Sequence, residues 1–412
     1  MTDASRVLRE PKLARLLAAL EATGRESRVV GGAVRDALLG LEPREIDIAT
    51  AALPEAVAKA ARDAGLKAVP TGLAHGTMTV VVEGTPFEVT TLREDVETFG
   101  RAAKVRFGAD FEQDALRRDF TVNAMSLSTD GRLHDYAGGQ ADLLARKIRF
   151  IGDPGTRIAE DYLRVLRFFR FHASIGEGPL DAEGLRAAIF ARENLRLLSR
   201  ERVRAEMLKL LSATRAAATI REMSQSGVIE ILLGLAYPAR LERFTAIEAA
   251  RGASPDPIAR LAALAVVTRE DAERLREGLR LSNAEYARLA LAATLVEQLH
   301  GHEGRFSAQE LNTMLFLNGR SGAADALALL HADSAAPPDD AEWRNAARFI
   351  VDAESPNFPI KSADLVALGV APGRALGAAL KRLQANWIRA GFPRDPRSVL
   401  QLLEDVAPNG GE

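Results

Sequence analysis

The spacing of hydrophobic and polar positions changes character near residue 150 of this chain. In the first part, leucines at positions 13, 16, 17 and 20 predict a helix over residues 10–22. Short apolar runs predict strands over residues 28–30, 46–50, 77–82 and 87–92, and a turn at 83–86 joins the last two in a hairpin. Helices are expected over residues 33–39 and from Pro54 to residue 63, because proline fits a first helical turn. Residues 92–116 are predicted to form a charged loop.

From Thr156 onward, apolar positions recur at helical spacing almost without a break. Alanine, leucine, arginine and glutamate dominate this part, and strand patterns fade. We therefore expect a mixed α/β domain that ends near residue 150, followed by an all-α remainder. A β-sheet beyond residue 220 would contradict this architecture.

The composition narrows the possible functions. The chain has 412 residues, 47% of them hydrophobic, which is enough for several domains. Its formal net charge of -2 means that any nucleic-acid surface must be a local basic patch. Cysteine is absent, which excludes disulfides and cysteine-based zinc sites. We find no P-loop motif, no long apolar run and no secretory leader, so we expect a cytoplasmic protein that has no membrane partner.

Two carboxylates stand at the start of the second predicted strand. Glu45 and Asp47 are two residues apart, so in a strand both side chains would face the same side. Such a pair repels unless a cation lies between the two groups, and Mg²⁺ prefers oxygen ligands and substrate phosphates. The sequence therefore predicts a metal site at Glu45 and Asp47, with a solvated acidic strand end as the alternative. Glu88, on the hairpin, could be a third catalytic carboxylate or a plain exposed strand residue.

Anion-binding groups flank these carboxylates in the sequence. Gly31 and Gly32 lie where a strand turns into a helix, so backbone N–H groups could approach a phosphate there. Arg35 follows one turn later and could contact a triphosphate. The segment from Arg117 to Met125 contains Arg118, Asp119 and Asn123, a set that could hold phosphate and ribose oxygens. An exposed, charged helix start is the alternative interpretation of that segment.

Together these segments resemble the class II tRNA nucleotidyltransferase and poly(A) polymerase family. The resemblance rests on Gly-Gly-Ala-Val-Arg-Asp at 31–36, Glu-Ile-Asp at 45–47, Glu-Val-Thr-Thr-Leu-Arg at 88–93 and Arg-Arg-Asp-Phe-Thr-Val-Asn-Ala-Met at 117–125. Further matches lie at 135–139, 152–167 and 199–203. The family implies a nucleotidyltransferase head with a polymerase-beta-like mixed sheet over residues 1–150 and a base-recognising neck over 151–215. A helical body over 216–335 and a tRNA-binding tail over 336–412 would follow.

The resemblance also implies an activity: template-independent addition of C, C and A to the 3′ end of tRNA, from CTP and ATP with Mg²⁺. Asp161 and Arg164 would select cytosine and adenine, which both offer an amino group beside an acceptor, with Arg167 and Arg170 alongside. We predict that Asp161, Arg164 and Arg167 share one helix face. Without the resemblance, a salt-bridged helix would be the preferred interpretation.

Two positions depart from the family pattern, which usually has Asp-x-Asp at 45–47 and Asp-Gly where this chain has Phe99-Gly100. The alternatives are a poly(A) polymerase, a partial CC- or A-adding enzyme, or a catalytically weak RNA-binding relative. The absence of a Gly-Arg-Arg-Phe run after residue 125 favours tRNA over poly(A) synthesis.

The last part of the chain is locally basic. Residues 361–397 contain seven Lys or Arg against two Asp, with Trp387 and Phe392 among them. This pattern fits either a face for the tRNA elbow or a helical bundle with basic side chains at its rim. We expect a monomer, with a homodimer as the alternative.

Overall fold

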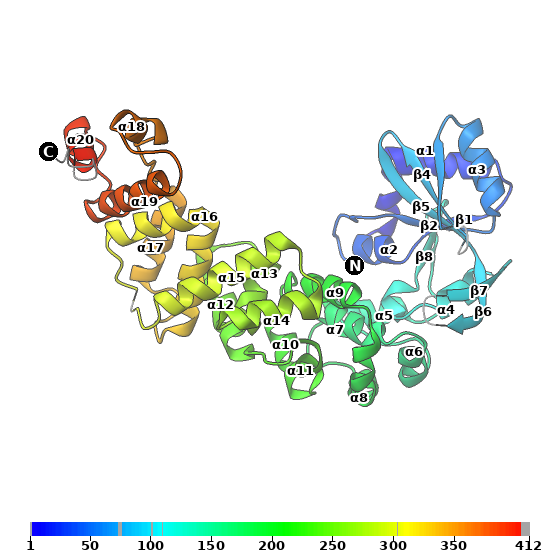
Figure 1. Ribbon diagram of the computed structural model, residues 1–412. Coiled ribbons are helices and arrows are strands. Elements are labelled where there is room, and N and C mark those ends of the chain that lie inside the picture. Colours follow the sequence, from blue (N-terminus) through cyan, green and yellow to red (C-terminus); the bar gives the residue numbers. More distant parts are fainter. Residues whose placement is uncertain (1, 73–75, 100–101, 109, 303, 405–412) are drawn as a thin grey trace. The chain divides into compact units, whose positions relative to one another are not determined.

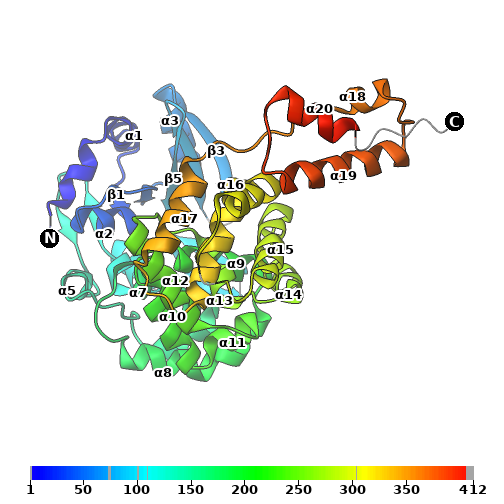
Figure 2. The same ribbon diagram turned by 90° about the vertical axis from the view of Figure 1, so that its left-hand side faces the viewer.

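The computed structural model describes residues 2–72, 76–99, 102–108, 110–302 and 304–404 (Figure 1). The chain forms two compact units, Met1–Gly234 and Leu235–Glu412. Every strand of the described residues lies before residue 135, and the rest of the described chain is helical (Figures 1 and 2). The predicted fold class, a mixed α/β head followed by helices, is therefore confirmed. The division into head, neck, body and tail remains a prediction.

A seven-stranded mixed sheet forms the centre of the first unit, in the order β3-β4-β5-β2-β1-β8-β9. Only β2 and β5 pair in parallel; the other neighbours are antiparallel. The strands are β1 (Ser27–Val30), β2 (Asp47–Thr50), β3 (Lys67–Gly72), β4 (Thr77–Val82), β5 (Thr85–Thr91), β8 (Ser126–Ser128) and β9 (Leu133–His134). Glu83 and Gly84 both have positive φ (49° and 79°), as a two-residue hairpin turn between β4 and β5 requires.

The register of the sheet separates an apolar row from a polar row. Paired positions across five strands form a buried row: Met78, Val89, Ile48, Val29 and Leu127. The next row along the strands faces the other side and carries Thr79, Glu88 and Asp47. Helices α1 (Pro11–Glu21), α2 (Gly32–Leu38) and α3 (Pro54–Asp63) pack against the sheet. One face is thus the main core, whereas the other carries the carboxylates and, beside them, a small buried cluster of Val30, Ala49, Leu92 and Phe111.

The prediction of a charged loop over residues 92–116 was wrong. This segment contains strand β6 (Arg93–Phe99), strand β7 (Ala102–Phe107) and helix α4 (Phe111–Leu116). Strands β6 and β7 form an antiparallel sheet of two strands. Backbone hydrogen bonds hold such a ribbon, so it needs no apolar alternation that a sequence could reveal. Phe99, which departs from the family pattern, is the last residue of β6, and Gly100 after it lies outside the described residues.

An aromatic cluster joins the end of the head to the helices that follow. The Phe120 ring lies 4.7 Å from Phe150 and 5.4 Å from Phe171, and Phe168 lies 5.4 Å from Phe150. Phe120 and Phe168 are fully buried, so this contact belongs to the core of the first unit. The helices of this region are α5 (Gly139–Leu144), α6 (Pro154–Glu160), α7 (Leu163–Ile175), α8 (Ala182–Ala191), α9 (Arg200–Leu211), α10 (Ala216–Gln225) and α11 (Val228–Leu233).

Helices alone build the second unit in its described part. They are α12 (Pro238–Arg251), α13 (Pro257–Ala265), α14 (Arg269–Leu279), α15 (Asn283–Gln298), α16 (Ala308–Asp333), α17 (Ala341–Asp352), α18 (Ser362–Ala367), α19 (Arg374–Arg389) and α20 (Pro396–Glu404). Trp387 is fully buried and packs edge-to-face against Phe316, Phe358 and Phe392. These tail aromatics therefore belong to a core and are not available to stack on bases. Among the described residues, no helix is both long and apolar enough to cross a membrane.

Candidate active site

Two carboxylates meet on the polar row of the sheet. Asp47 is the first residue of β2, and its partner in the parallel register is Glu88 on β5. Directly paired residues of neighbouring strands project to the same side, and both side chains are exposed. Glu45, by contrast, precedes the strand and lies exposed in a bend. The argument that placed Glu45 and Asp47 on one strand face was wrong, because the extended backbone on which it depended begins only at Asp47.

The electrostatics of this pair favour a bound cation. Although the Asp47 side chain is exposed, the protein around its carboxylate removes part of the hydration and raises its pKa; the charges of Glu88 and Glu45 raise this pKa further, and Arg118 opposes them. A cation between the carboxylates would remove this repulsion. In the described part of the chain, no group of three or more acidic or histidine side chains could hold a metal. Two carboxylates with substrate phosphates are nevertheless a sufficient donor set for Mg²⁺, so the residues present fit the predicted ion.

The glycine pair forms a tight strand-to-helix turn. Gly31 has φ 70° and ψ −124°, a conformation that residues with a side chain rarely adopt. A Cβ atom at Gly31 would lie 2.8 Å from Nη1 of Arg118, so the arginine packs where only glycine fits. The Gly31 N–H donates to the carbonyl of Met125 at 3.0 Å and is not free for an anion. Gly32 begins α2.

A hydrogen-bonded network joins the predicted nucleotide-binding residues of the head. Arg35 donates from Nη1 to Oδ1 of Asn123 at 2.7 Å, and the Asn123 amide nitrogen lies 3.3 Å from Oδ1 of Asp119. Arg118 donates to the Asn123 carbonyl at 3.3 Å and to Asp114 at 3.0 Å. Positions far apart in sequence therefore form one cluster, and its cations already have fixed orientations.

Asp119 connects this cluster to helix α7. It is 8% exposed and accepts from Nε of Arg167 at 2.6 Å. Burial would raise the pKa of Asp119, but the charge and hydrogen bonds of Arg167 and a hydrogen bond from Asn123 outweigh it and hold that pKa below its usual value. Asp119 and Arg167, which were each predicted to bind nucleotide, thus form an ion pair between the head and helix α7.

The guanidinium groups of three arginines lie around Phe171, which is also a residue of α7. The Cζ atoms of Arg35, Arg167 and Arg170 lie 5.1, 5.3 and 3.9 Å from the centre of its ring. Arg170 also donates to Glu206 at 2.5 Å. Each of these cations is also paired with a carboxylate, Arg35 with Asp36, Arg167 with Asp119 and Arg170 with Glu206, and the ring and these pairs allow the three to lie close together.

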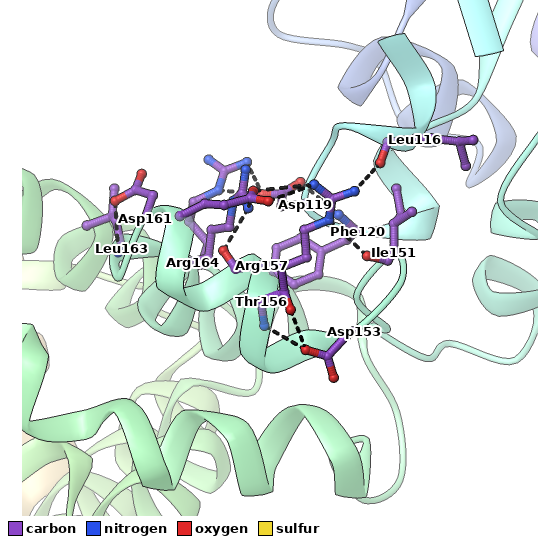
Figure 3. Close-up of polar contacts among 12 residues, drawn as sticks. Leu116, Asp119, Phe120, Ile151, Asp153, Thr156, Arg157, Asp161, Leu163 and Arg164 are labelled. Carbon is purple, nitrogen blue, oxygen red and sulfur yellow. Dashed lines mark hydrogen bonds and ion pairs between the residues drawn. The ribbon is translucent and has the colours of Figure 1, made fainter. Parts of the chain in front are cut away.

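The predicted base-reading residues are arranged differently from the expectation (Figure 3). Asp161 is not on a face of α7: it ends α6 with an extended backbone (φ −156°, ψ 107°). Its Oδ2 accepts from Arg202 at 2.6 Å, and its Oδ1 accepts from the Leu163 N–H at 3.1 Å. Arg164 donates to the carbonyl of Arg157 at 2.7 Å and pairs with Glu160. Helical spacing was the wrong model here because the chain breaks between α6 and α7.

Sequence reasoning assigned no role to two arginines that organise this region. Arg202 lies in the Ser-Arg-Glu-Arg-Val segment that carried part of the resemblance, which was the available signal. Arg157 donates to the carbonyls of Leu116 and Ile151, and so ties α6 to the end of α4 and to the segment after the head (Figure 3).

Comparison with known proteins identifies the family. A family model described as "Poly A polymerase head domain" matches residues 27–149, and one described as "Probable RNA and SrmB- binding site of polymerase A" matches residues 183–237. The mitochondrial CCA tRNA nucleotidyltransferase 1 of Mus musculus is 33% identical over 92% of this chain and 86% of its own length. The chain belongs to the tRNA nucleotidyltransferase and poly(A) polymerase family.

Bacterial members of the family match over nearly the full length. The CCA-adding enzyme of Limosilactobacillus fermentum is 31% identical over 95% of this chain and 96% of its own length. Among solved structures, the Bacillus stearothermophilus CCA-adding enzyme in complex with CTP has a TM-score of 0.76 and 26% identity, over 98% of both chains. A Thermotoga maritima CCA-adding enzyme complexed with tRNA shares the fold, with a TM-score of 0.68 and 23% identity. The family's fold therefore extends through the helical second unit.

Proposed function

We propose that this protein adds the sequence CCA to the 3′ end of tRNA, using CTP and ATP, releasing pyrophosphate and needing no nucleic-acid template. One observation carries the proposal: Asp47 and Glu88 are paired in the parallel register beside the Gly31 turn, in a chain that matches CCA-adding enzymes over most of its length.

The chemistry assigned to the site follows from its donors. Asp47 and Glu88, with Glu45 nearby, would hold Mg²⁺, which supplies positive charge to the triphosphate when it is bound. Glu88 accepts the proton of the tRNA 3′ hydroxyl as that oxygen attacks the α-phosphorus of the nucleotide, and pyrophosphate leaves. Arg35 and Arg118 donate to the triphosphate, and Asn123 holds both in place.

Base selection is assigned to the region between α6 and α9. Asp161 accepts from the amino group that cytosine and adenine share, and Arg164 donates to the adjacent ring acceptor. Arg202 would orient the Asp161 carboxylate through their 2.6 Å hydrogen bond, so it acts as a positioning residue. Arg167 and Arg170 would stand alongside the base-selecting pair, each held by its own carboxylate, Asp119 or Glu206.

The tail offers a surface for tRNA. All seven lysines and arginines of residues 361–397 are exposed, whereas the aromatic residues among them are buried. Such a surface binds phosphates without base specificity. Replacing Lys381 and Arg382, neighbours on α19, by alanine should weaken tRNA binding and flatten its salt dependence. An unchanged salt dependence would place the tRNA contact elsewhere.

The test is incorporation of labelled CTP and ATP into tRNA that lacks its CCA end, with and without Mg²⁺. Full CCA addition requires two C residues and then one A; a poly(A) polymerase would add many A residues, and a partial enzyme would stop early. Asp47→Ala should abolish transfer yet leave tRNA binding nearly intact, whereas Glu45→Asp should keep or raise activity. Transfer retained by Asp47→Ala would refute the assignment of the carboxylates. A cytoplasmic location and a monomeric state remain predictions.

A further inference from the structure

Five helices of the second unit line an open cavity that the proposed reaction does not use. Helices α12, α13, α15, α16 and α17 contribute to its wall, and its volume is about 620 Å³. Figure 2 shows α16 and α17 side by side, and α12 packs against α16. Volumes of this order are typical of sites for small molecules. Phe244, Ile247, Ala328, Ala347 and Val351 make much of the wall apolar.

A half-buried arginine without a carboxylate partner lies in this wall. Arg251 is the last residue of α12, and its Nε is buried without an acceptor among the described residues. Its Nη2 lies 3.1 Å from Nδ1 of His331, whose Nε2 lies 2.9 Å from the carbonyl of Pro337. A carbonyl only accepts, so Nε2 carries the proton and Nδ1 accepts from the arginine. The neighbour of Arg251 is therefore a neutral imidazole, which does not offset its charge.

The carboxylates of the wall are engaged with other arginines. Glu248 accepts from Arg260 at 2.7 Å. Asp325 accepts from Arg288 at 2.6 and 2.9 Å, and Asp256 lies 2.8 Å from the same guanidinium while it caps α13. These three carboxylates are held by two arginines, and Arg251, Arg344 and Arg348 add three more cations at the wall, so positive charge is in excess there.

Two more cations stand at the same cavity. Arg344 and Arg348 lie one turn apart on α17, line the wall and are exposed. The cavity thus combines an apolar wall, a half-buried guanidinium whose Nε has no acceptor among the described residues, and two accessible guanidinium groups. We propose that it is a binding site for a small organic anion with an apolar body, whose carboxylate, sulfonate or phosphate group is held by Arg251.

The test uses a matched pair of fluorescent probes on the full chain. Anilinonaphthalene sulfonate is an apolar anion, and phenylnaphthylamine has the same rings without the sulfonate. The native protein should bind the sulfonate at one site per chain and the uncharged amine at least about 10-fold more weakly, because a charge-assisted contact is lost. Arg251→Gln should weaken binding of the sulfonate by about 10-fold or more and leave that of the amine unchanged.

Controls keep the result interpretable. Arg269→Gln, at an exposed position at the start of α14, should leave sulfonate binding unchanged. If Arg251→Gln fails to fold by circular dichroism, the double variant Arg344→Gln/Arg348→Gln at exposed positions replaces it and should weaken the sulfonate several-fold. CCA addition by all these variants should equal that of the native protein, so this inference and the proposed function can fail independently.

Three results would overturn the inference. The first is equal affinity of the native protein and the Arg251→Gln variant for the sulfonate. The second is equal affinity of the native protein for both probes, which would indicate a purely apolar groove. The third is the absence of sulfonate binding by the native protein.

Discussion

The ion pair between Asp119 and Arg167 should be a main support of the joint between the head and α7. Oδ2 of Asp119 lies 2.6 Å from both Nε and Nη2 of Arg167, and the Asp119 side chain is 9% exposed against 32% for Arg167. Removing one partner of a fully buried pair costs about 3–5 kcal/mol. Water can reach part of the guanidinium, so we expect Asp119→Asn to destabilise the first unit by about 2–3 kcal/mol.

Amide hydrogen exchange measured by mass spectrometry can isolate this effect. Exchange of protected amides in α2 and α7 should accelerate by roughly 100-fold, since about 1.4 kcal/mol corresponds to tenfold. The two tryptophans of the chain, Trp343 and Trp387, both lie in the second unit. The urea midpoint that their fluorescence reports for the second unit should therefore be the same in the native protein and in Asp119→Asn. This equality serves as the internal control.

A double-mutant cycle with Arg167→Gln provides the decisive comparison. If the pair acts as a unit, the double variant should lose about 2 kcal/mol less than the sum of the single variants. The pKa of Asp119 is held below its ordinary value, so the pair stabilises the fold above about pH 3.9 and this contribution fades as the pH falls below that value. The native protein and Asp119→Asn should then converge in acid. Additive losses, or a single-variant loss below about 0.5 kcal/mol, would refute this reasoning.

Three further predictions concern the turn, base choice and acid stability. Gly31→Ala should raise the KM for CTP and ATP roughly tenfold, because it strains the backbone by about 1–3 kcal/mol and places a methyl group against the Arg118 guanidinium. The control Gly32→Ala meets only ordinary contacts and should have little effect on either KM. Equal effects of the two variants would argue against backbone strain at Gly31. Asp161→Ala and Arg202→Gln should both weaken the discrimination against UTP and GTP by about 1–3 kcal/mol, measured as kcat/KM for each of the four nucleotides. An equal decrease of kcat/KM for all four nucleotides would mean that these residues have a structural role. Burial lowers the pKa of His172 to about 4, so the first unit should lose up to about 3 kcal/mol as the pH falls from about 6.5 to 4, and the variant His172→Leu should flatten that dependence in urea unfolding followed by circular dichroism.

Local patterns in the sequence were sufficient to predict the helices and strands that bury one regular face. The helix at Pro11–Glu21 and the hairpin of β4 and β5 were predicted within a few residues, because periodic apolar positions record which side faces the core. The ordered motifs also indicated the family, since turn glycines, carboxylates and arginines recur in them at characteristic positions. Strands β6 and β7 were missed because backbone hydrogen bonds between two strands can form without a regular apolar pattern.

Tertiary structure alone decided which side chains meet. The parallel register of β2 and β5 places Glu88 beside Asp47, although about forty residues separate them, and leaves Glu45 outside the strand. In the same way, Asp161 pairs with Arg202 rather than with a neighbour on its own helix. The partner of a charged side chain depends on which segments the fold brings together. A sequence pattern shows where the charges are but does not show which of them come into contact. The sequence by itself therefore determined the family and the chemistry available, whereas the fold determined which carboxylates and guanidinium groups act together.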